Sequence, residues 1–402
     1  MSTSGDRGYP LSGVTVLDLG QIYNGSYATF LMAMAGADVI KVEPPRGEYL
    51  RARSAVAGAA MPFAMLNSNK KSVILDLKQE EGKTLFKRMV AKADIVLENF
   101  APGIMDRLGV GWDVLSAINP RLIYASGSGF GLSGPYRDYP AMDLTVQAMA
   151  GLMSVTGYPD QPPVKCGPAL CDYAGGTHLY AATMTALYER ERTGRGRLVE
   201  VSMQESVYMT ISSNLALWYA SGGSIPMRTG NRHGGLATAP YNVYPSTDGY
   251  VAIICVNDRH WRSLTEVMGR PELAEDARYA TLKNRVERMD EVDEIVATWT
   301  RVRPKEEAFQ ALIANRVPAA PVRDIAEVVA DPHLHERGMI RWVDHPEFGR
   351  IVLPNSPLRF HGSPMMALEP SPKLGEDGDA FYRDFLELSE EEMTALKEKQ
   401  VI

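Results

Sequence analysis

Short apolar runs alternate with helical patterns through the first half of the chain, and this alternation limits the possible folds more than any other feature. Parallel strands need a crossover connection of a dozen or more residues, usually a helix. The candidate strands are 14–19, 39–43, 72–77, 94–98 and 121–126, and the helical patterns between and after them are 26–35, 79–92, 104–108 and 143–153. The pattern predicts an α/β domain with a mostly parallel sheet and buried strands.

The second half of the chain has a different pattern. Residues 204–220 predict one long helix, which ends at a Ser-Gly-Gly step, and a glycine-rich stretch follows it. Two apolar runs at 241–244 and 250–255 flank a Thr-Asp-Gly turn and predict a hairpin. Because helical patterns then fill about 258–315, we predict a second, smaller α+β domain over 225–325.

The composition is that of an ordinary globular protein, with 45% apolar and 23% charged residues among 402. A net charge of −7 argues against nucleic-acid binding, which needs clustered Lys and Arg. No apolar run approaches the ~20 residues that span a bilayer, and the first residues do not resemble a secretion signal. Three cysteines, Cys166, Cys171 and Cys255, fit a reducing compartment. We expect a cytoplasmic protein that binds neither nucleic acid nor membranes.

A G-x-G-x-x-G pattern at Gly129, Gly131 and Gly134 follows the strand candidate 121–126. A dinucleotide fingerprint should open a helix and be followed about 20 residues later by an acidic residue. Pro135 comes next instead, and the region near 150–156 holds no acid. A glycine-rich turn that passes close to a ligand or another backbone explains the pattern equally well.

The sequence gives little support for serine hydrolysis or for metal chemistry. Ser126 and Ser128 follow a strand, but neither has glycines at the second position on both sides, so the nucleophile elbow is absent. His333 and His335 are the closest histidine pair, and they stand in a polar segment without further ligands. We expect no metal site.

Basic and polar residues stand near several predicted strand ends in the first half. They are Lys70, Lys71, Lys78, Asn99, Phe100 and Arg107. Ligands of open α/β sheets bind beyond the carboxyl ends of the strands, so these cations could hold phosphates. Phe100 or Tyr23 could stack on a base. On the residues alone, ordinary solvated charge remains the simpler interpretation.

Asp172 stands just before a Gly-Gly step, at the start of a long helical pattern. As an N-cap it would accept backbone N–H bonds, and those bonds and the helix dipole would lower its pKa. An ionised carboxylate can also attack an activated acyl group, and Gly175 and Gly176 leave room for a large substrate. Without further information, capping is the simpler interpretation.

Several ordered motifs resemble one known family over nearly the full chain. The motifs are AGADVIKVE (35–43), NSNKKSVILDLK (67–78), ENFAPG (98–103), DRLG (106–109), SGFGLSGP (128–135), DLTVQA (143–148) and TGRGRLVEVSM (193–203), together with the stretch around Asp172. The chain resembles the class III coenzyme A transferases, the group of formyl-CoA transferase and carnitine CoA-transferase.

The resemblance implies an interlocked homodimer with a Rossmann-like large domain. That domain would span 1–205 and include the returning segment 340–402, with a linker helix at 206–224 and a second linker at 326–339. The active site would lie between the large domain of one subunit and the small domain of its partner. No permanently bound cofactor is implied, because coenzyme A is a substrate.

The resemblance also assigns roles to residues. Asp172 falls at the family's catalytic aspartate, and Gly234 and Gly235 fall in the region of its mobile glycine loop. The positions that contact CoA in the family are occupied here by Tyr23, Asn24, Leu75, Asp76, Leu77, Lys78, Asn99, Phe100, Ala101 and Arg107. Tyr23 stands where formyl-CoA transferase has a Gln. A CoA-contacting Arg of that enzyme falls at Pro44 here, and Arg46 is the candidate to replace it.

The implied reaction moves CoA from a donor acyl-CoA, such as succinyl-CoA or another small acyl-CoA, to an acceptor carboxylic acid. It passes through an aspartyl anhydride and an aspartyl-CoA thioester. Two alternatives remain. An α-methylacyl-CoA racemase would need a histidine immediately before Asp143, where this chain has Met142. A non-catalytic acyl-CoA-binding protein would keep the fold without turnover.

Overall fold

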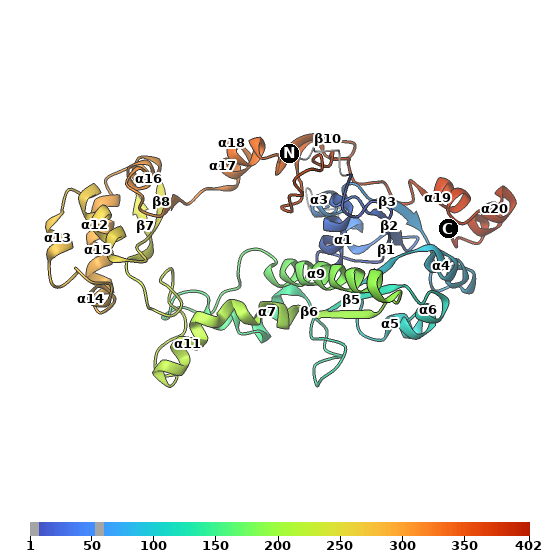
Figure 1. Ribbon diagram of the computed structural model, residues 1–402, viewed down its shortest axis with the longest axis horizontal. Coiled ribbons are helices and arrows are strands. Elements are labelled where there is room, and N and C mark those ends of the chain that lie inside the picture. The colour runs from blue at the N-terminus through green and yellow to red at the C-terminus, as the bar shows by residue number, and fades with distance from the viewer. Residues whose placement is uncertain (1–7, 53–59) are drawn as a thin grey trace. The chain divides into compact units, whose positions relative to one another are not determined.

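The computed structural model describes residues 8–52 and 60–402, so the opening residues, where no secretion signal is expected, lie mostly outside it. The chain forms two compact units (Figure 1). The first comprises residues 1–146, 168–207 and 331–402, and the second comprises 147–167 and 208–330. The domain and linker boundaries that the resemblance implies stay a prediction.

A six-stranded sheet organises the first unit, and all its neighbouring strands are parallel. Its order is β3 (Lys71–Ile74), β2 (Asp38–Glu43), β1 (Thr15–Asp18), β4 (Ile95–Glu98), β5 (Ile123–Ser128) and β6 (Leu198–Ser202). This 3-2-1-4-5-6 order confirms the predicted parallel α/β fold. The order reverses between β1 and β4, and ligands of such sheets bind outside the strand ends at that point.

Both faces of the sheet are covered by helices (Figure 1), because successive strand residues point to opposite faces. Val16 packs in the cluster beneath α1 (Asn24–Met34) and α9 (Leu170–Thr193). Its neighbour Leu17 packs in the cluster that includes α4 (Glu80–Lys92). The C-terminal helices α19 (Gly378–Asp384) and α20 (Glu390–Glu398) contribute to this second cluster.

The first unit has several smaller elements. They are α2 (Tyr49–Ala52), α3 (Met61–Asn67), α5 (Ile104–Arg107), α6 (Trp112–Ile118), α10 (Met203–Tyr208), α18 (Pro332–Glu336), and the antiparallel pair β10 (Ile340–His345) and β11 (Gly349–Pro354). The hairpin packs on α3 through Ile351 and Leu353. Helix α7 (Asp143–Met149) begins in this unit.

The second unit has its own core, in which residues of α12 (Asp258–Val267), α13 (Glu272–Glu275), α15 (Met289–Thr300) and α16 (Lys305–Ala314) pack on an antiparallel three-stranded sheet. The sheet order is β7 (Tyr241–Ser246), β8 (Gly249–Ile254) and β9 (Ala319–Pro321), and α14 (Leu282–Val286) lies between α13 and α15 in the chain. This arrangement confirms the predicted hairpin. The unit also includes α8 (Leu152–Val155), α11 (Ser212–Ser221) and α17 (Ile325–Val329).

The segment 204–220, expected as one helix, is interrupted. Helix α10 ends at Tyr208, a 3₁₀ turn spans Met209–Ile211, and α11 follows and ends at the left-handed Gly222. None of the helices in the described ranges is long and apolar enough to cross a membrane.

Candidate active site

Asp172 is the third residue of α9 and lies in its first turn. The N-cap position belongs to Ala169, so the expectation that Asp172 caps the helix is wrong. Asp143 takes that part, because its Oδ1 accepts the backbone N–H of Cys171 at 2.8 Å. Over residues 8–52 and 60–402, no hydrogen bond or ion pair engages the Asp172 carboxylate, although only 9% of the residue is exposed.

The pKa of Asp172 is raised, not lowered as the helix position suggested. Burial removes water from the carboxylate, and the nearby charge of Asp143 adds repulsion, so the pKa rises to about 7. The carboxylate is therefore basic for an aspartate, and no described group neutralises its charge. A carboxylate in this state is a better nucleophile than one held in an ion pair.

A cavity of about 580 Å³ opens in front of Asp172. It is lined by five of the residues expected to contact CoA, which are Asn24, Asn99, Phe100, Ala101 and Arg107. These residues follow β1 and β4, the two strands at which the sheet order reverses. The cavity therefore occupies the position that the fold favours for a ligand.

A second cavity of about 350 Å³ lies beside the first. Four further expected residues line it, namely Leu75, Asp76, Leu77 and Lys78, which follow β3. Gln21, Phe100 and Arg107 line both cavities, so the two spaces adjoin. Nine of the ten residues expected at CoA contacts thus border one continuous region of the first unit.

The wall between the two cavities is a short turn after β1 that is held from two sides. The Asn99 side chain accepts the Gln21 N–H at 2.7 Å and donates to the Gln21 carbonyl at 3.0 Å. Glu48 Oε2 accepts the Ile22 N–H at 3.3 Å. Ile22 has φ +58°, a costly conformation for a β-branched residue. These bonds hold the strained turn in place.

A family model described as CoA-transferase family III matches residues 11–378. The chain belongs to this family of CoA-transferases. The formyl-CoA:oxalate CoA-transferase of Streptomyces coelicolor is 37% identical over an alignment 413 positions long. The alignment covers 98% of this chain and 99% of that relative. The succinyl-CoA–D-citramalate CoA-transferase of Chloroflexus aurantiacus is 36% identical, with 98% of each chain covered.

A solved structure supports the same assignment. The crystal structure of a CAIB/BAIF family protein from Brucella suis matches with a TM-score of 0.82 and 35% identity, and it covers 94% of this chain and 100% of that one. The resemblance inferred from the motifs is therefore confirmed, and the chain is a family III CoA-transferase.

Four residues that the resemblance singled out in this CoA-transferase do not line either cavity. Tyr23 instead stacks on Tyr173, with ring centroids 5.8 Å apart and an interplanar angle of 19°. Gly234 and Gly235 belong to the second unit, where Gly234 lies against Asn214. Arg46, the suggested substitute for an arginine at Pro44, is exposed in the turn after β2 and does not line the cavity that Pro44 borders.

Lys70, considered above as a phosphate ligand, is buried. Its Nζ donates to Asp18 at 2.9 Å and also to Thr29, Asn67 and the Ser26 carbonyl. Lys71 pairs with Asp38 at the surface. Of the three lysines, only Lys78 lines either of the two adjoining cavities. Solvated charge was the right interpretation for Lys71 and the wrong one for Lys70, whose ammonium is buried in an ion pair.

Arg137 was missed by sequence reasoning, although it stands only three residues after Gly134 of the glycine-rich turn. It lines the larger cavity together with Arg107. Neither guanidinium has an ion-pair partner in the described part of the chain. The larger cavity therefore brings the buried, unpaired Asp172 carboxylate together with two unpaired guanidinium groups and the exposed Asp138.

Met142 lines the larger cavity at the position where a racemase would need histidine, and no histidine is among the described residues that line it.

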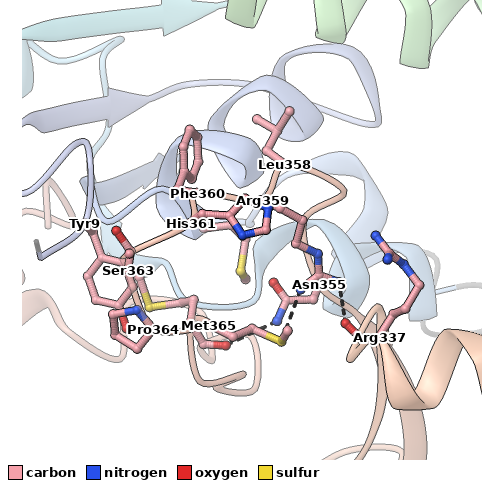
Figure 2. A pocket seen from close by; sticks show the side chains of 13 residues that line it. Tyr9, Arg337, Asn355, Leu358, Arg359, Phe360, His361, Ser363, Pro364 and Met365 are labelled. Atoms are coloured by element: carbon pink, nitrogen blue, oxygen red, sulfur yellow. Dashed lines mark hydrogen bonds between the residues drawn. The ribbon is translucent and has the colours of Figure 1, made fainter. Parts of the chain in front are cut away.

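A separate cavity of about 390 Å³ lies around the C-terminal segment, where Arg359 donates to the Arg337 carbonyl and to Met365 Sδ (Figure 2). It contains none of the expected site residues. No group of three His, Cys, Asp or Glu side chains within 8–52 and 60–402 could hold a metal.

Proposed function

We propose that Asp172 is the nucleophile of this CoA-transferase and carries CoA between two acids. The observation that carries the proposal is the buried Asp172 carboxylate, which has no partner in the described chain and faces a cavity bordered by two unpaired arginines. A carboxylate that served only stability would be expected to have a hydrogen bond or an ion pair.

The proposed reaction proceeds by acyl exchange. The Asp172 carboxylate attacks the donor thioester carbonyl, the C–S bond breaks, and CoA leaves as the thiolate. The thiolate then attacks the aspartyl carbonyl of the anhydride, and the donor acid leaves as its carboxylate. The acceptor carboxylate attacks the resulting aspartyl-CoA thioester and releases CoA thiolate again. The thiolate finally attacks the acceptor acyl carbon, which gives the new acyl-CoA and regenerates Asp172.

The adjoining cavities suggest how CoA is held. Arg107 borders both spaces, and its guanidinium is suited to a phosphate of the CoA diphosphate. The smaller cavity is lined by Leu19, Val42 and Leu77, which offer apolar surface to the remainder of the CoA molecule. We propose that the expected residues that line these two cavities, apart from Asn24, contact CoA there.

The donor and acceptor are proposed only by class. Relatives at 36–37% identity are named for formyl-CoA with oxalate, acetyl-CoA with oxalate, and succinyl-CoA with D-citramalate. We keep succinyl-CoA or another small acyl-CoA as the proposed donor. Incubation of the enzyme with a panel of acyl-CoA donors and carboxylic acids, followed by mass spectrometry of the thioesters, identifies the pair.

We further propose that the enzyme works as an interlocked homodimer in the cytoplasm, with Gly234 and Gly235 in a loop that covers the site of the partner subunit. Exposed apolar residues on both units support this assembly, among them Tyr139, Leu144, Met209 and Tyr219. Light scattering during size-exclusion chromatography should give twice the chain mass of 44.2 kDa. A monomer at micromolar concentration would contradict the assembly.

The decisive test traps the covalent intermediate. Wild-type enzyme mixed with donor acyl-CoA alone should yield an Asp172-CoA thioester that hydroxylamine converts to a hydroxamate at that residue. Asp172→Asn should give no adduct and lose at least about 10³-fold in kcat. Full activity of that variant would rule out the nucleophile. Inversion of a 2-methylacyl-CoA without an acceptor acid would support a racemase instead.

A further inference from the structure

Asn24, the first residue of α1, is buried without any hydrogen bond for its side chain. The residue is 2% exposed, and both Nδ2 and Oδ1 lack a partner in the described structure. Buried amides in folded proteins are almost always hydrogen-bonded, because an unpaired polar group has lost its water without compensation. An orphaned amide that lines the same cavity as Asp172 therefore calls for a partner that is absent from the free enzyme.

Two glycines make the space in which this amide lies. A Cβ at Gly175 of α9 would stand 2.3 Å from Asn24 Nδ2, and a Cβ at Gly127 of β5 would stand 2.5 Å from Oδ1. Both separations are shorter than real contacts of a Cβ. The chain thus keeps side-chain atoms away from both ends of an unpaired amide, although glycine inside a helix costs stability.

The amide also lies close to the turn of α9 that carries Asp172. Residues three apart on a helix share a face, with Cβ atoms about 5–6 Å apart. Since Nδ2 is 2.3 Å from the Cβ position of residue 175, it lies within about 8 Å of the Asp172 Cβ. Both side chains also line the same cavity, so an oxygen that forms on the Asp172 carbonyl shares that space with the Asn24 amide.

We propose that Asn24 is a catalytic hydrogen-bond donor whose Nδ2 binds the oxyanion that forms on the Asp172 carbonyl. The inference rests on the proposed function. When CoA thiolate adds to the aspartyl carbonyl of the anhydride, the S–C bond forms and the C=O electron pair moves onto oxygen. Asn24 donates to that oxygen until the C–O bond to the donor acyl group breaks and its carboxylate leaves.

A neutral amide suits this task. A cation at the same place would pair with the Asp172 carboxylate and weaken it as a nucleophile, whereas the hydrogen bond from a neutral amide to the anhydride carbonyl strengthens as charge develops on that oxygen. The missing hydrogen bonds of the free enzyme are then the expected state of a donor that is fixed in advance for an intermediate.

The test compares Asn24→Ala and Asn24→Val with Ser26→Ala. Ser26 is a matched control, because its hydroxyl is also buried and unpaired on α1 but lines neither cavity. Both Asn24 variants should keep the wild-type KM for acyl-CoA within about threefold and lose about 10²–10³-fold in kcat. Rapid-quench measurement should show the same loss in the formation of the Asp172-CoA thioester, while Ser26→Ala stays within about twofold of wild type.

Three outcomes overturn the inference. They are a kcat within threefold of wild type, a raised KM with unchanged kcat, and an equal loss in Ser26→Ala. Melting curves identify any variant that does not fold, and Asn24→Val refills most of the space that Asn24→Ala empties. Asp172→Asn is assayed in parallel. If it stays active, the proposed function fails; if it is inactive while the Asn24 variants are active, only this inference fails.

Discussion

At the scale of single residues, Asp172 combines a functional advantage with a cost to stability. Its pKa is raised to about 7 by burial first and by the charge of Asp143 second. A group whose pKa is higher in the folded state stabilises the fold below its unfolded pKa of about 3.9. That contribution is lost as pH rises toward 7, because the folded state then has to carry a buried, unpaired anion.

Replacement of Asp172 by Asn should therefore stabilise the protein above pH 7. Asparagine carries no charge at any pH, so the gain over wild type should grow between pH 4 and 7 and reach at most about 4 kcal/mol. Urea unfolding at pH 4.5, 6 and 8 measures it. The same variant at pH 4.5 is the control, where its gain should be no more than about 1 kcal/mol. A variant less stable than wild type at pH 8 would contradict the raised pKa.

At the scale of elements, the site depends on glycines and amides that let strands, turns and helices approach. Gly175 on α9 and Gly127 on β5 admit the Asn24 side chain, and Asn99 at the end of β4 binds the turn after β1. Each of these contacts joins segments that are distant in sequence. The local sequence pattern determines where the helices and strands form. How closely they approach one another around the site depends on these few glycine and asparagine side chains.

Gly175→Ala should lower kcat by at least about tenfold, although alanine favours a helix by about 1 kcal/mol over glycine. The new methyl would lie 2.3 Å from Asn24 Nδ2 and 3.0 Å from Met203 Cγ, so the amide must move. Steady-state kinetics and a melting curve test this. Gly378→Ala in α19 is the control, because its methyl would meet nothing closer than 3.9 Å, and its kinetics should be unchanged.

Asn99→Ala should raise the KM for acyl-CoA about tenfold or more, because the turn at Gln21 loses both of its side-chain hydrogen bonds. Asn119→Ala removes an equivalent set of bonds, two donated to the carbonyls of Val90 and Ala93 and one accepted from the Arg121 N–H. Asn119 lines neither cavity. It should lower stability by about 1–3 kcal/mol and leave KM unchanged, and equal KM effects in both variants would contradict a role for the turn.

At the scale of the whole molecule, the parallel sheet and the second core could be predicted because apolar runs and helical spacing are local signals. The break of 143–153 at Gly151, with φ +83°, and the 3₁₀ turn at Met209–Ile211 have weaker local signals. The hairpin β10–β11 was missed because its surroundings are polar and rich in proline. The local sequence pattern therefore predicted the strands of the main sheet better than the short helices and the hairpin outside it.

The site was predictable from the sequence only where family motifs fixed its residues. The cap on α9 comes from Asp143, 28 residues before Cys171, and the partner of Lys70 is 52 residues away. The pKa of Asp172 depends on burial, which no neighbouring residue determines. The cap of α9, the partner of Lys70 and the pKa of Asp172 all depend on residues distant in the sequence. Predictions made from adjacent residues were therefore wrong for all three.

The long-range packing of α19 gives the last prediction. Tyr382 is 2% exposed in the core beneath the sheet, and its hydroxyl donates to the Ile74 carbonyl. Tyr382→Ala should cost about 3–5 kcal/mol in the free energy of unfolding. Tyr188→Ala on the exposed side of α9 is the control and should change it by less than about 0.5 kcal/mol, since Tyr188 is 68% exposed. Equal effects in urea unfolding would contradict a structural role for this contact.

The contacts of β3 with the C-terminal segment also set an order of events during synthesis. The Ile74 carbonyl meets its partner 308 residues later in the chain, and the Asp76 N–H donates to the Val401 carbonyl at 2.9 Å. Ile74 and Asp76 lead into the loop that walls the smaller cavity. A ribosome that has finished every strand of the sheet still holds a chain in which the edge beside the smaller cavity is open. That edge is exposed to chaperones, proteases and other nascent chains until the final helices emerge, so slow translation of the last hundred codons should harm this enzyme more than slow translation of the first hundred.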